Sequence, residues 1–446
     1  MKSHSIHVCR ECGTTSPRWA GRCAGCGEWN TLDEERTPSK PRTTATLATT
    51  SLRESNDENQ AVISSGVGEL DRVLGGGFVA GSTMLLFGEP GVGKSTLALM
   101  SLRALALSKK PVLLIAAEES AAQVAQRARR FGDVPDGLEV AVTTDVDAAG
   151  RLLRELRPTL CVVDSISAMS DESLASVTGS VPQIRHAAER LCAAAKESGT
   201  ALILVGHVTK DGELAGPRTL EHLVDTVVRI EGDRHATLRF VRAMKHRFGP
   251  TGEVGLLEMV SAGLRDLPDA ALTLRGPQLD VPGVVFSVTN DGSRSLLVEM
   301  QALAASSSGS PRRVAHQVSS QRLSLLLAVL EARCAVDTSA CDVFAATAGG
   351  LPANEPGVDV ALALAVASAA MNFAVPRSVA AMGEVGLAGE LRAISGLTRR
   401  VREAHRLGAT AVIVPSSGEL DDVSGVVVHR CASLVEAIGI AQSGTK

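Results

Sequence analysis

Residues 88–95 read GEPGVGKS, which matches the Gly-x-x-x-x-Gly-Lys-Ser/Thr spacing of a phosphate-binding loop. The apolar run at 83–87 predicts a buried strand before the loop, and the run at 96–107 predicts a helix after it. This order brings the backbone N–H groups of the loop and the N-terminus of the helix around a bound phosphate group. The sequence therefore predicts an α/β fold that binds a nucleoside triphosphate.

The phosphate-binding loop supplies the residues that are expected to contact the nucleotide. Lys94 is expected to reach the β- and γ-phosphates of ATP, and Ser95 is expected to bind the Mg²⁺ ion. The full set of expected nucleotide contacts is Gly88, Glu89, Pro90, Gly91, Val92, Gly93, Lys94, Ser95 and Thr96.

Two acidic residues follow apolar runs and are expected to complete the site. Asp164 ends the run at 160–164, and a residue in this position holds Mg²⁺ together with Ser95, usually through water. Glu118 follows the run at 112–116 and is expected to orient or deprotonate the attacking water. Alternatively, Glu118 and its acidic neighbour simply favour a helix N-terminus. The predicted catalytic residues are Lys94, Glu118 and Asp164.

Four cysteines near the N-terminus are spaced as in a zinc-binding module. They form two Cys-x-x-Cys pairs, which can supply four thiolates to a tetrahedral Zn²⁺ ion. A module of this length buries too little apolar area to fold alone, so the metal is expected to supply its stability. Trp19 and Trp29, the only tryptophans, are expected to pack over the zinc knuckles, with stacking on nucleic-acid bases as the alternative. The predicted zinc ligands are Cys9, Cys12, Cys23 and Cys26.

Changes in composition along the chain predict three folded segments. The second segment alternates apolar strands with helical stretches, which predicts a mostly parallel sheet with helices on both faces. The third mixes alanine-rich helices with short strands and is predicted to be an α+β domain. The predicted boundaries are 1–32 for the zinc module, 33–60 for a flexible linker, 61–265 for the nucleotide-binding domain, 266–313 for a connecting segment and 314–446 for the last domain.

The overall composition excludes several classes of protein. The formal net charge of the 446 residues is −4, so the chain as a whole does not indicate nucleic-acid binding, and any such surface must be local. No apolar run is long enough to cross a membrane, and the polar N-terminus does not resemble a signal peptide. We therefore expect a cytoplasmic protein that does not bind membranes. In that reducing compartment, the nine cysteines are expected to bind metal or pack in cores.

Several motifs carry a resemblance to known families. The run GELDRVLGGG at 68–77, directly before the phosphate-binding loop, resembles RecA-like ATPases. Together with the zinc module, four further motifs resemble the RadA (Sms) family of bacterial DNA-repair proteins. The four motifs are GHVTK at 206–210, GPR at 216–218, LEHLVD at 220–225 and KHRFG at 245–249. The KHRFG motif resembles the family's Lys-Asn-Arg-Phe-Gly motif, with His246 in place of asparagine.

This resemblance implies that two loops after strands of the sheet face DNA. In RecA-like proteins, the segments corresponding to 165–183 and 208–222 point into the channel of a ring or filament. In the second segment, Lys210 and Arg218 would neutralise DNA phosphates without reading bases. His207 matches the position of a γ-phosphate sensor that is usually glutamine, and is expected to couple nucleotide state to this loop.

The KHRFG motif offers two further basic residues. Lys245 and Arg247 are expected either to contact DNA or to reach the nucleotide of a neighbouring subunit, where a cation stabilises transition-state charge. A solvated basic turn is the third possibility. The sequence does not separate these roles.

The third segment resembles the proteolytic domain of Lon, through GEVGLAGE at 383–390 and the run that follows it to Pro415. That family uses a Ser–Lys dyad, in which the lysine assists deprotonation of the serine. Gly357 stands where the serine would be, and the lysine region reads Thr-Arg-Arg at 398–400. A guanidinium stays charged and cannot act as the base. The resemblance therefore implies a Lon-like domain without its catalytic dyad.

Taken together, the resemblance implies a DNA-dependent ATPase with ATP, Mg²⁺ and Zn²⁺ as cofactors. Its implied role is branch migration during homologous recombination and DNA repair, which extends the heteroduplex after strand invasion by RecA. The implied assembly is a hexameric ring on single-stranded and branched DNA, with the Lon-like domain as scaffold and the zinc module docking a partner such as RecA. The alternatives are an ATP-dependent protease, a nucleotide-gated scaffold or adaptor of the KaiC type, and a DnaB-type replicative helicase.

Overall fold

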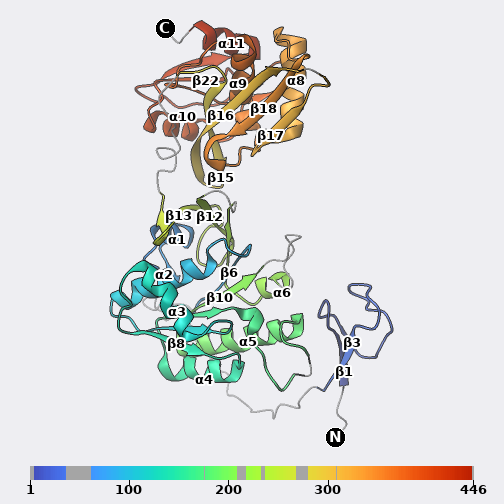
Figure 1. Ribbon diagram of the computed structural model, residues 1–446, viewed down its shortest axis with the longest axis vertical. Helices are drawn as coiled ribbons and strands as arrows, with labels where there is room; N and C mark the ends of the chain where they lie inside the picture. Colours follow the sequence, from blue (N-terminus) through green and yellow to red (C-terminus); the bar gives the residue numbers. More distant parts are fainter. Residues whose placement is uncertain are drawn as a thin grey trace, which may run out of the picture. The chain divides into compact units, whose positions relative to one another are not determined.

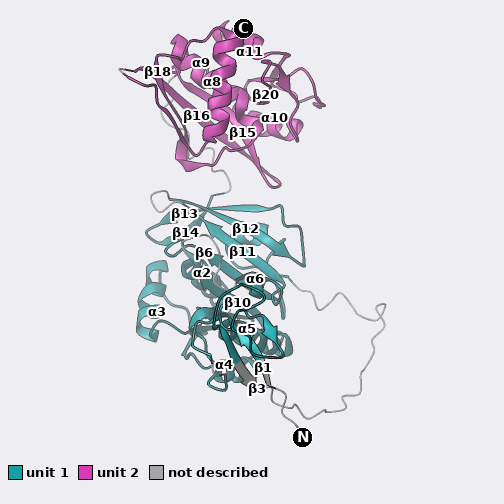
Figure 2. Ribbon diagram, turned by 90° about the vertical axis from the view of Figure 1, so that its right-hand side faces the viewer, with its two compact units in different colours: residues 1–267 teal, residues 268–446 magenta. Residues whose placement is uncertain are grey.

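The computed structural model divides the chain into two compact units, residues 1–267 and 268–446 (Figure 2). The predicted flexible linker begins later than expected, because its first residues, 33–36, belong to a strand. The rest of the predicted linker lies outside the described residues. The structure describes residues 5–36, 62–174, 176–207, 217–232, 237–267, 280–307 and 309–443.

The first unit is built on a nine-stranded sheet in the order β14-β13-β12-β11-β6-β10-β9-β7-β8 (Figure 1). The strands from β11 to β8 are parallel to their neighbours, and β12, β13 and β14 extend the sheet with antiparallel pairing. The strands are β6 (Thr83–Gly88), β7 (Val112–Ala116), β8 (Leu138–Val142), β9 (Leu160–Asp164), β10 (Ala201–His207), β11 (Thr226–Glu231), β12 (Leu238–His246), β13 (Val254–Val260) and β14 (Gly263–Asp266).

Helices pack against both faces of this sheet, which confirms the predicted architecture. Strand β6 shows the pattern: Met84 and Leu86 join a core with α1, α2 and α3, whereas Leu85 and Phe87 join a core with α4, α5 and α6. No described helix combines the length and hydropathy required to cross a lipid bilayer. The helices are α1 (Gly68–Val73), α2 (Lys94–Leu107), α3 (Ala121–Ala128), α4 (Val146–Leu156), α5 (Val181–Ser198) and α6 (Pro217–Glu221).

The N-terminal module is a three-stranded antiparallel sheet in the order β2-β1-β3. Its described core contains only Cys9, Cys23 and Leu32, with Cys12 packed against them. So small a core supports the expectation that folding of the module depends on metal. The strands are β1 (Ser5–Cys9), β2 (Thr15–Ser16) and β3 (Leu32–Arg36).

The second unit contains a seven-stranded mixed sheet in the order β17-β18-β16-β15-β19-β22-β23. Helix α10 packs against β15, β16, β19 and β22 through a core that includes Val288, Leu297 and Val401. A short hairpin of β20 (Glu384–Val385) and β21 (Leu391–Arg392) lies between β19 and α10 in sequence. The sheet strands are β15 (Val284–Asp291), β16 (Arg294–Ser306), β17 (Arg313–His316), β18 (Cys341–Thr347), β19 (Val379–Ala381), β22 (Ala411–Pro415) and β23 (Val427–Cys431), and the helices are α8 (Ser320–Cys334), α9 (Asp359–Met371), α10 (Leu397–Arg406) and α11 (Leu434–Ser443).

The structure differs from the predicted connecting segment at 266–313. Strands β15 and β16 form a hairpin that lies within the sheet of the second unit, so most of this segment belongs to that unit. The end of the predicted connecting segment is also held in place, because the Arg312 side chain donates to Asp342 at 2.8 Å.

Gly357, expected in place of the Lon serine, lies next to Arg400, one of the three residues in the region expected to replace the lysine. A Cβ atom built on Gly357 would lie 2.8 Å from Nη1 of Arg400, so a serine would not fit beside this guanidinium. Arg400 is fully buried and donates to both carboxylate oxygens of Glu355, at 2.6 and 2.7 Å. It also donates to the carbonyl oxygens of Val288 at 2.6 Å and Ser395 at 3.1 Å. Gly357 therefore lies against an ion pair whose arginine is fully buried.

This ion pair predicts a pH-dependent contribution to the stability of the second unit. Burial works to raise the pKa of Glu355, but hydrogen bonds from Arg400 and the Asn290 backbone outweigh it and hold this pKa below its usual value. The ionised carboxylate therefore stabilises the fold above a pH of about 4.3, the pKa in an unfolded chain, and that stability is lost as the pH falls through the folded pKa.

We expect Glu355→Gln to destabilise the second unit by about 3 kcal/mol at neutral pH, because it leaves the Arg400 charge buried without its partner. The difference from the wild type should shrink as the pH falls below about 4, where the wild-type carboxylate also takes up a proton. Hydrogen exchange of the β15 and α10 amides measures this, with the exposed Glu419→Gln as the matched control. A loss of protection that is equal at all pH values would contradict the assignment.

Candidate active site

The phosphate-binding loop lies between β6 and α2, where the sequence predicted it. Lys94 is buried, and its Nζ donates to the carbonyl oxygens of Gly88 and Glu89, both at 2.9 Å. Gly93 has a φ of 113° and lies against the side chain of Met259, so this turn requires a residue without Cβ. The loop thus wraps around the ammonium group of Lys94 at the N-terminus of α2.

The parallel strands bring the three predicted catalytic residues to one edge of the sheet. Asp164 pairs with Ala116 of β7 on one side and with Val205 of β10 on the other. Burial lowers the pKa of Lys94, and the negative charges of Asp164 and Glu118 oppose this shift. The two carboxylates therefore lie close enough to Lys94 to interact with its charge.

A hydroxyl group and a guanidinium organise the acidic residues at this edge. The hydroxyl of Ser165, which is fully buried, donates to the carboxylate of Glu118 and lies 2.8 Å from the hydroxyl of Ser167. Arg127 on α3 forms an ion pair with Glu119, and its Nη1 is 4.0 Å from Oδ2 of Asp164. Glu119 is therefore held by α3, which leaves Glu118 as the glutamate next to the strand ends.

Arg239 on β12 supports the phosphate-binding loop from a distant part of the sequence. Its side chain is buried, and its Nε donates to the carbonyl oxygen of Val92 at 3.0 Å. Because the peptide between Val92 and Gly93 is trans, its N–H points away from the carbonyl oxygen that Arg239 holds. Arg239 thus fixes the direction of an N–H group in the loop that is expected to bind phosphate.

These residues fit ATP with Mg²⁺. Ser95 lies in the first turn of α2 and Asp164 at the end of β9, which are the oxygen donors that a magnesium ion bound to ATP requires. The ammonium group of Lys94 and the N–H groups of the loop supply the complementary charge for the phosphates. Bound Mg²⁺ would neutralise phosphate charge, while Glu118 is placed to orient a water molecule.

Sequence reasoning missed Ser165, Arg127 and Arg239. A signal for Ser165 was present, since it directly follows Asp164, and Arg239 lies between two apolar residues, Leu238 and Phe240, at the start of β12. Their partners, however, lie 47 residues away for Ser165 and 147 residues away for Arg239. Only the sheet topology brings these partners together.

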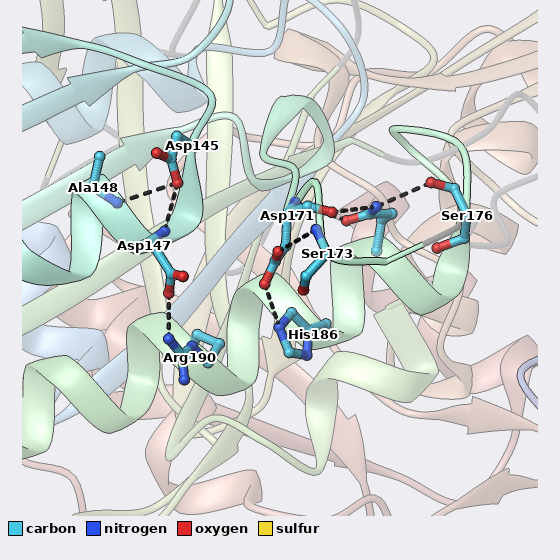
Figure 3. A network of polar contacts seen from close by, with 9 residues as sticks. Asp145, Asp147, Ala148, Asp171, Ser173, Ser176, His186 and Arg190 are labelled. Atoms are coloured by element: carbon cyan, nitrogen blue, oxygen red, sulfur yellow. Dashed lines mark hydrogen bonds and ion pairs between the residues drawn. The ribbon is translucent and has the colours of Figure 1, made fainter. Parts of the chain in front are cut away.

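The loop after β9, expected to face DNA, is tied to α5 and carries no basic residue. The side chain of Gln183 receives the N–H of Asp171 at 3.0 Å and donates to the carbonyl oxygens of Asp171 and Ser176. The Asp171 carboxylate accepts the N–H of Ser173 at 2.8 Å and lies 2.9 Å from Nε2 of His186 (Figure 3). The described part of this loop is therefore acidic and held in place, so it does not offer cations to phosphates.

Residues 208–216 of the second loop, which include Lys210, lie outside the described residues, as do the side chains of His207 and Arg218. The backbone of His207 pairs with Gly88 at the start of the phosphate-binding loop. The KHRFG motif holds the segment that follows this loop. Lys245 donates to the carbonyl oxygens of Glu221 at 2.6 Å and Val224 at 2.8 Å.

Arg247 and His246 add to this connection. Nη1 of Arg247 donates to the buried Asp225 at 3.0 Å. The ring of His246 contacts the hydroxyl of Thr226 at 3.0 Å and the carbonyl oxygen of Leu74 at 3.3 Å. Histidine thus forms two specific contacts in the place of the family's asparagine. The motif therefore holds in place the segment from Glu221 to Thr226, where the second loop ends and β11 begins.

The four predicted zinc ligands form one cluster. Their sulfur atoms all lie within 4.8 Å of one another, with 3.6 Å between Cys9 and Cys26 and 3.5 Å between Cys12 and Cys23. Thiolates at about 2.3 Å from Zn²⁺ form a tetrahedron with edges of about 3.8 Å, so the cluster fits this ion. Backbone N–H groups of Cys26 and Gly25 lower the pKa of Cys23 to about 6, which favours the thiolate that the metal needs.

The two tryptophans differ from their expected packing. Trp19 and Trp29 are 59% and 67% exposed, so the zinc knuckles cover less than half of either side chain. The interpretation that they pack over the knuckles is wrong.

The Arg239 contact yields a testable prediction. We expect Arg239→Met to raise the KM for ATP by about tenfold, because the loop loses a charged donor that orients its backbone. Arg239→Lys should restore part of this loss. Steady-state ATP hydrolysis measures the effect, with Arg229→Met on the neighbouring strand β11 as the control. A variant that unfolds at lower temperature but keeps the wild-type KM would assign Arg239 a purely structural role.

Three protein families match separate parts of the chain. The KaiC ATPase family matches residues 63–149, the rubredoxin metal-binding domain matches residues 7–34, and the Lon protease (S16) C-terminal proteolytic domain matches residues 334–432. These matches agree with the folds described above. The first unit contains a RecA-like ATPase domain and a four-cysteine zinc module, and the second is a Lon-like domain.

Curated relatives match nearly the whole chain. The DNA repair protein RadA of Mycolicibacterium smegmatis is 43% identical over 431 residues, which cover 93% of this chain and 92% of the relative. The RadA protein of Pseudomonas aeruginosa is 43% identical over 425 residues and covers 93% of each chain. That of Bacillus subtilis is 38% identical over 459 residues, which cover 99% of this chain and all of the relative. By this similarity, the chain belongs to the RadA family of bacterial DNA-repair proteins.

Proposed function

We propose that this protein is a DNA-dependent ATPase that drives branch migration of recombination intermediates together with RecA. The observation that carries the proposal is the convergence of Lys94, Glu118 and Asp164 at the edge where β10 also ends. Strand β10 leads directly into the second loop, so a change at the γ-phosphate has a short covalent path to that loop. Mg²⁺ and ATP are the proposed cofactors of the site, and Zn²⁺ that of the N-terminal module.

The proposed DNA contacts come from the second loop and its surroundings. Lys210 and Arg218 are proposed to neutralise phosphates of single-stranded and branched DNA, and His207 to report nucleotide state to them. The acidic first loop supports this division, because it leaves the second loop as the source of positive charge. Lys245 and Arg247 are proposed either to reach DNA or the neighbouring subunit's nucleotide once the ring forms.

The proposed assembly is a homohexameric ring in the bacterial cytoplasm, where its DNA substrate is found. The Lon-like domain is proposed to serve as its scaffold and not as a protease. Supporting this, Gly357 has no nucleophile and Arg400 is committed to the Glu355 ion pair, so neither residue can take part in acyl transfer. RecA is the proposed partner in recombination.

The first test is ATP hydrolysis by the zinc-loaded protein with and without single-stranded DNA. We expect strong stimulation by DNA, because the proposed DNA loop adjoins the nucleotide site. Lys94→Ala should lower turnover at least about 100-fold by removing a cation from the developing phosphate charge. Lys110→Ala, which changes an exposed lysine beyond α2, is the matched control and should behave as the wild type.

Two results would overturn this proposal. ATP binding without hydrolysis, with or without DNA, would favour a nucleotide-gated scaffold. Turnover that is indifferent to DNA would break the proposed link between the nucleotide site and the second loop.

The position of His207 predicts a variant in which hydrolysis and DNA are separated. We expect His207→Ala to reduce DNA stimulation more than basal turnover, since the side chain is proposed to carry the signal between them. His207→Gln should retain stimulation, because the amide can still bond to a phosphate oxygen. Titration of ATPase activity with single-stranded DNA measures both. Unchanged stimulation in His207→Ala would show that the signal takes another path.

A further inference from the structure

The zinc module exposes an aromatic pair that the nucleotide site does not use. Trp19 and Trp29 are 59% and 67% exposed, and they are the only large hydrophobic side chains exposed among residues 7–33. Leaving two indoles in water forgoes much of the burial that stabilises small modules. Because the core of this module is so small, the exposure of both indoles indicates that they have a partner outside it.

The two indoles lie on either side of one small residue. A Cβ atom built on Gly21 would lie 3.7 Å from Cζ3 of Trp29 and 3.8 Å from Cη2 of Trp19. The backbone at Gly21 therefore forms a common floor to which both rings approach. Arg22 pairs with Trp29 through an isolated β-bridge, which fixes the positions of the two segments that carry the rings.

Positive charge borders this aromatic pair. The Cζ of Arg22 is 5.9 Å from the centroid of the Trp29 ring, and its Nε donates to the carbonyl oxygen of Gly27 at 2.7 Å. Arg18, directly before Trp19, is also exposed. Among the described residues of the first unit, no carboxylate forms an ion pair with Arg18 or Arg22. Both guanidinium groups thus remain available to an anionic ligand.

This combination favours one class of ligand. Proteins that bind single-stranded nucleic acids without sequence preference use exposed aromatic rings next to basic side chains. The bases stack on the rings, and the basic side chains neutralise the phosphates. A protein-binding surface of this kind usually surrounds its aromatic anchors with further apolar area. Residues 7–33 expose no aliphatic side chain of large size beside the two indoles. Residues 7–33 contain three arginines and three acidic residues, so their net charge is zero. The two arginines beside the indoles, together with the composition, fit nucleic acid better than a protein partner.

We propose that Trp19 and Trp29 form a stacking platform for single-stranded DNA, with Arg18 and Arg22 binding its phosphates. The zinc module is then a second DNA-binding site, separate from the second loop of the ATPase domain. The proposal rests on the proposed function only in its choice of DNA as the nucleic acid. It does not depend on ATP hydrolysis.

The composition of the chain supplies a direct probe. The protein has two tryptophans and no tyrosine, so its indole fluorescence comes from this module alone. We expect oligothymidylate of about 16 nucleotides to quench the fluorescence of the full-length, zinc-loaded protein, because a stacked base quenches an indole. Quenching should saturate and should weaken as salt is raised. Free tryptophan amide, titrated with the same oligonucleotide, corrects for light absorbed by DNA.

Variants separate stacking from folding of the module. We expect Trp19→Ala and Trp29→Ala each to weaken binding of a labelled oligothymidylate at least about fivefold. Trp19→Phe and Trp29→Phe should bind nearly as the wild type does, since phenylalanine also stacks. Zinc content, measured for every variant, identifies any that have lost the module. Arg10→Ala, which changes a basic residue paired with Glu11, is the matched control for charge.

The outcomes are distinct. Absence of quenching at saturating DNA, or alanine variants that keep zinc and bind as tightly as the wild type, would overturn the proposal. Quenching by RecA protein but not by DNA would also overturn it and assign the pair to a protein partner. Quenching that persists in Lys94→Ala, in a protein whose ATPase is indifferent to DNA, would support the platform while the proposed function failed.

Discussion

The candidate active site depends on the register of four parallel strands, β6, β10, β9 and β7. A shift of one residue in β9 would move Asp164 by about 3.3 Å and turn its carboxylate to the other face of the sheet. Such a shift is costly, because it would pull a charged group into strands that are buried on both faces. The boundary between each apolar run and the polar residue that ends it therefore sets the register. The burial of the apolar strands therefore determines where the expected catalytic side chains lie.

Local patterns predicted the parts of the fold and site that local physics decides. The phosphate-binding loop, the strand that ends at Asp164 and the four-cysteine cluster each depend on short spacings, and the structure brings these residues together as expected. The contacts of Ser165 with Glu118 and of Arg239 with Val92 depend on strand order instead, which no short spacing encodes. The hairpin of β15 and β16 differs from the predicted connecting segment, because its membership of the second sheet depends on pairing with β18 and β19, which lie far along the sequence.

In the Lon-like unit, a region expected to replace the Ser–Lys dyad forms part of the core. Arg400 has a charged partner and further acceptors for its guanidinium, so its burial is balanced by hydrogen bonds. Gly357 is required beside it, since any side chain there would strike the guanidinium. Gly357 and Arg400 are therefore coupled, because the guanidinium occupies the space that a side chain at position 357 would need.

A contiguous set of hydrogen bonds connects the segment that ends the second loop with the strand before the phosphate-binding loop. Asp225 accepts bonds from the backbone N–H and the hydroxyl of Thr83, at 3.0 and 2.8 Å, and Thr83 begins the strand that leads into that loop. Arg247 donates to the same carboxylate, and Lys245 donates to the carbonyl oxygens of Glu221 and Val224, which precede Asp225 in the sequence. The segment cannot move far without breaking these bonds or displacing β6. The KHRFG motif therefore connects the segment around Asp225 to the strand that leads into the phosphate-binding loop.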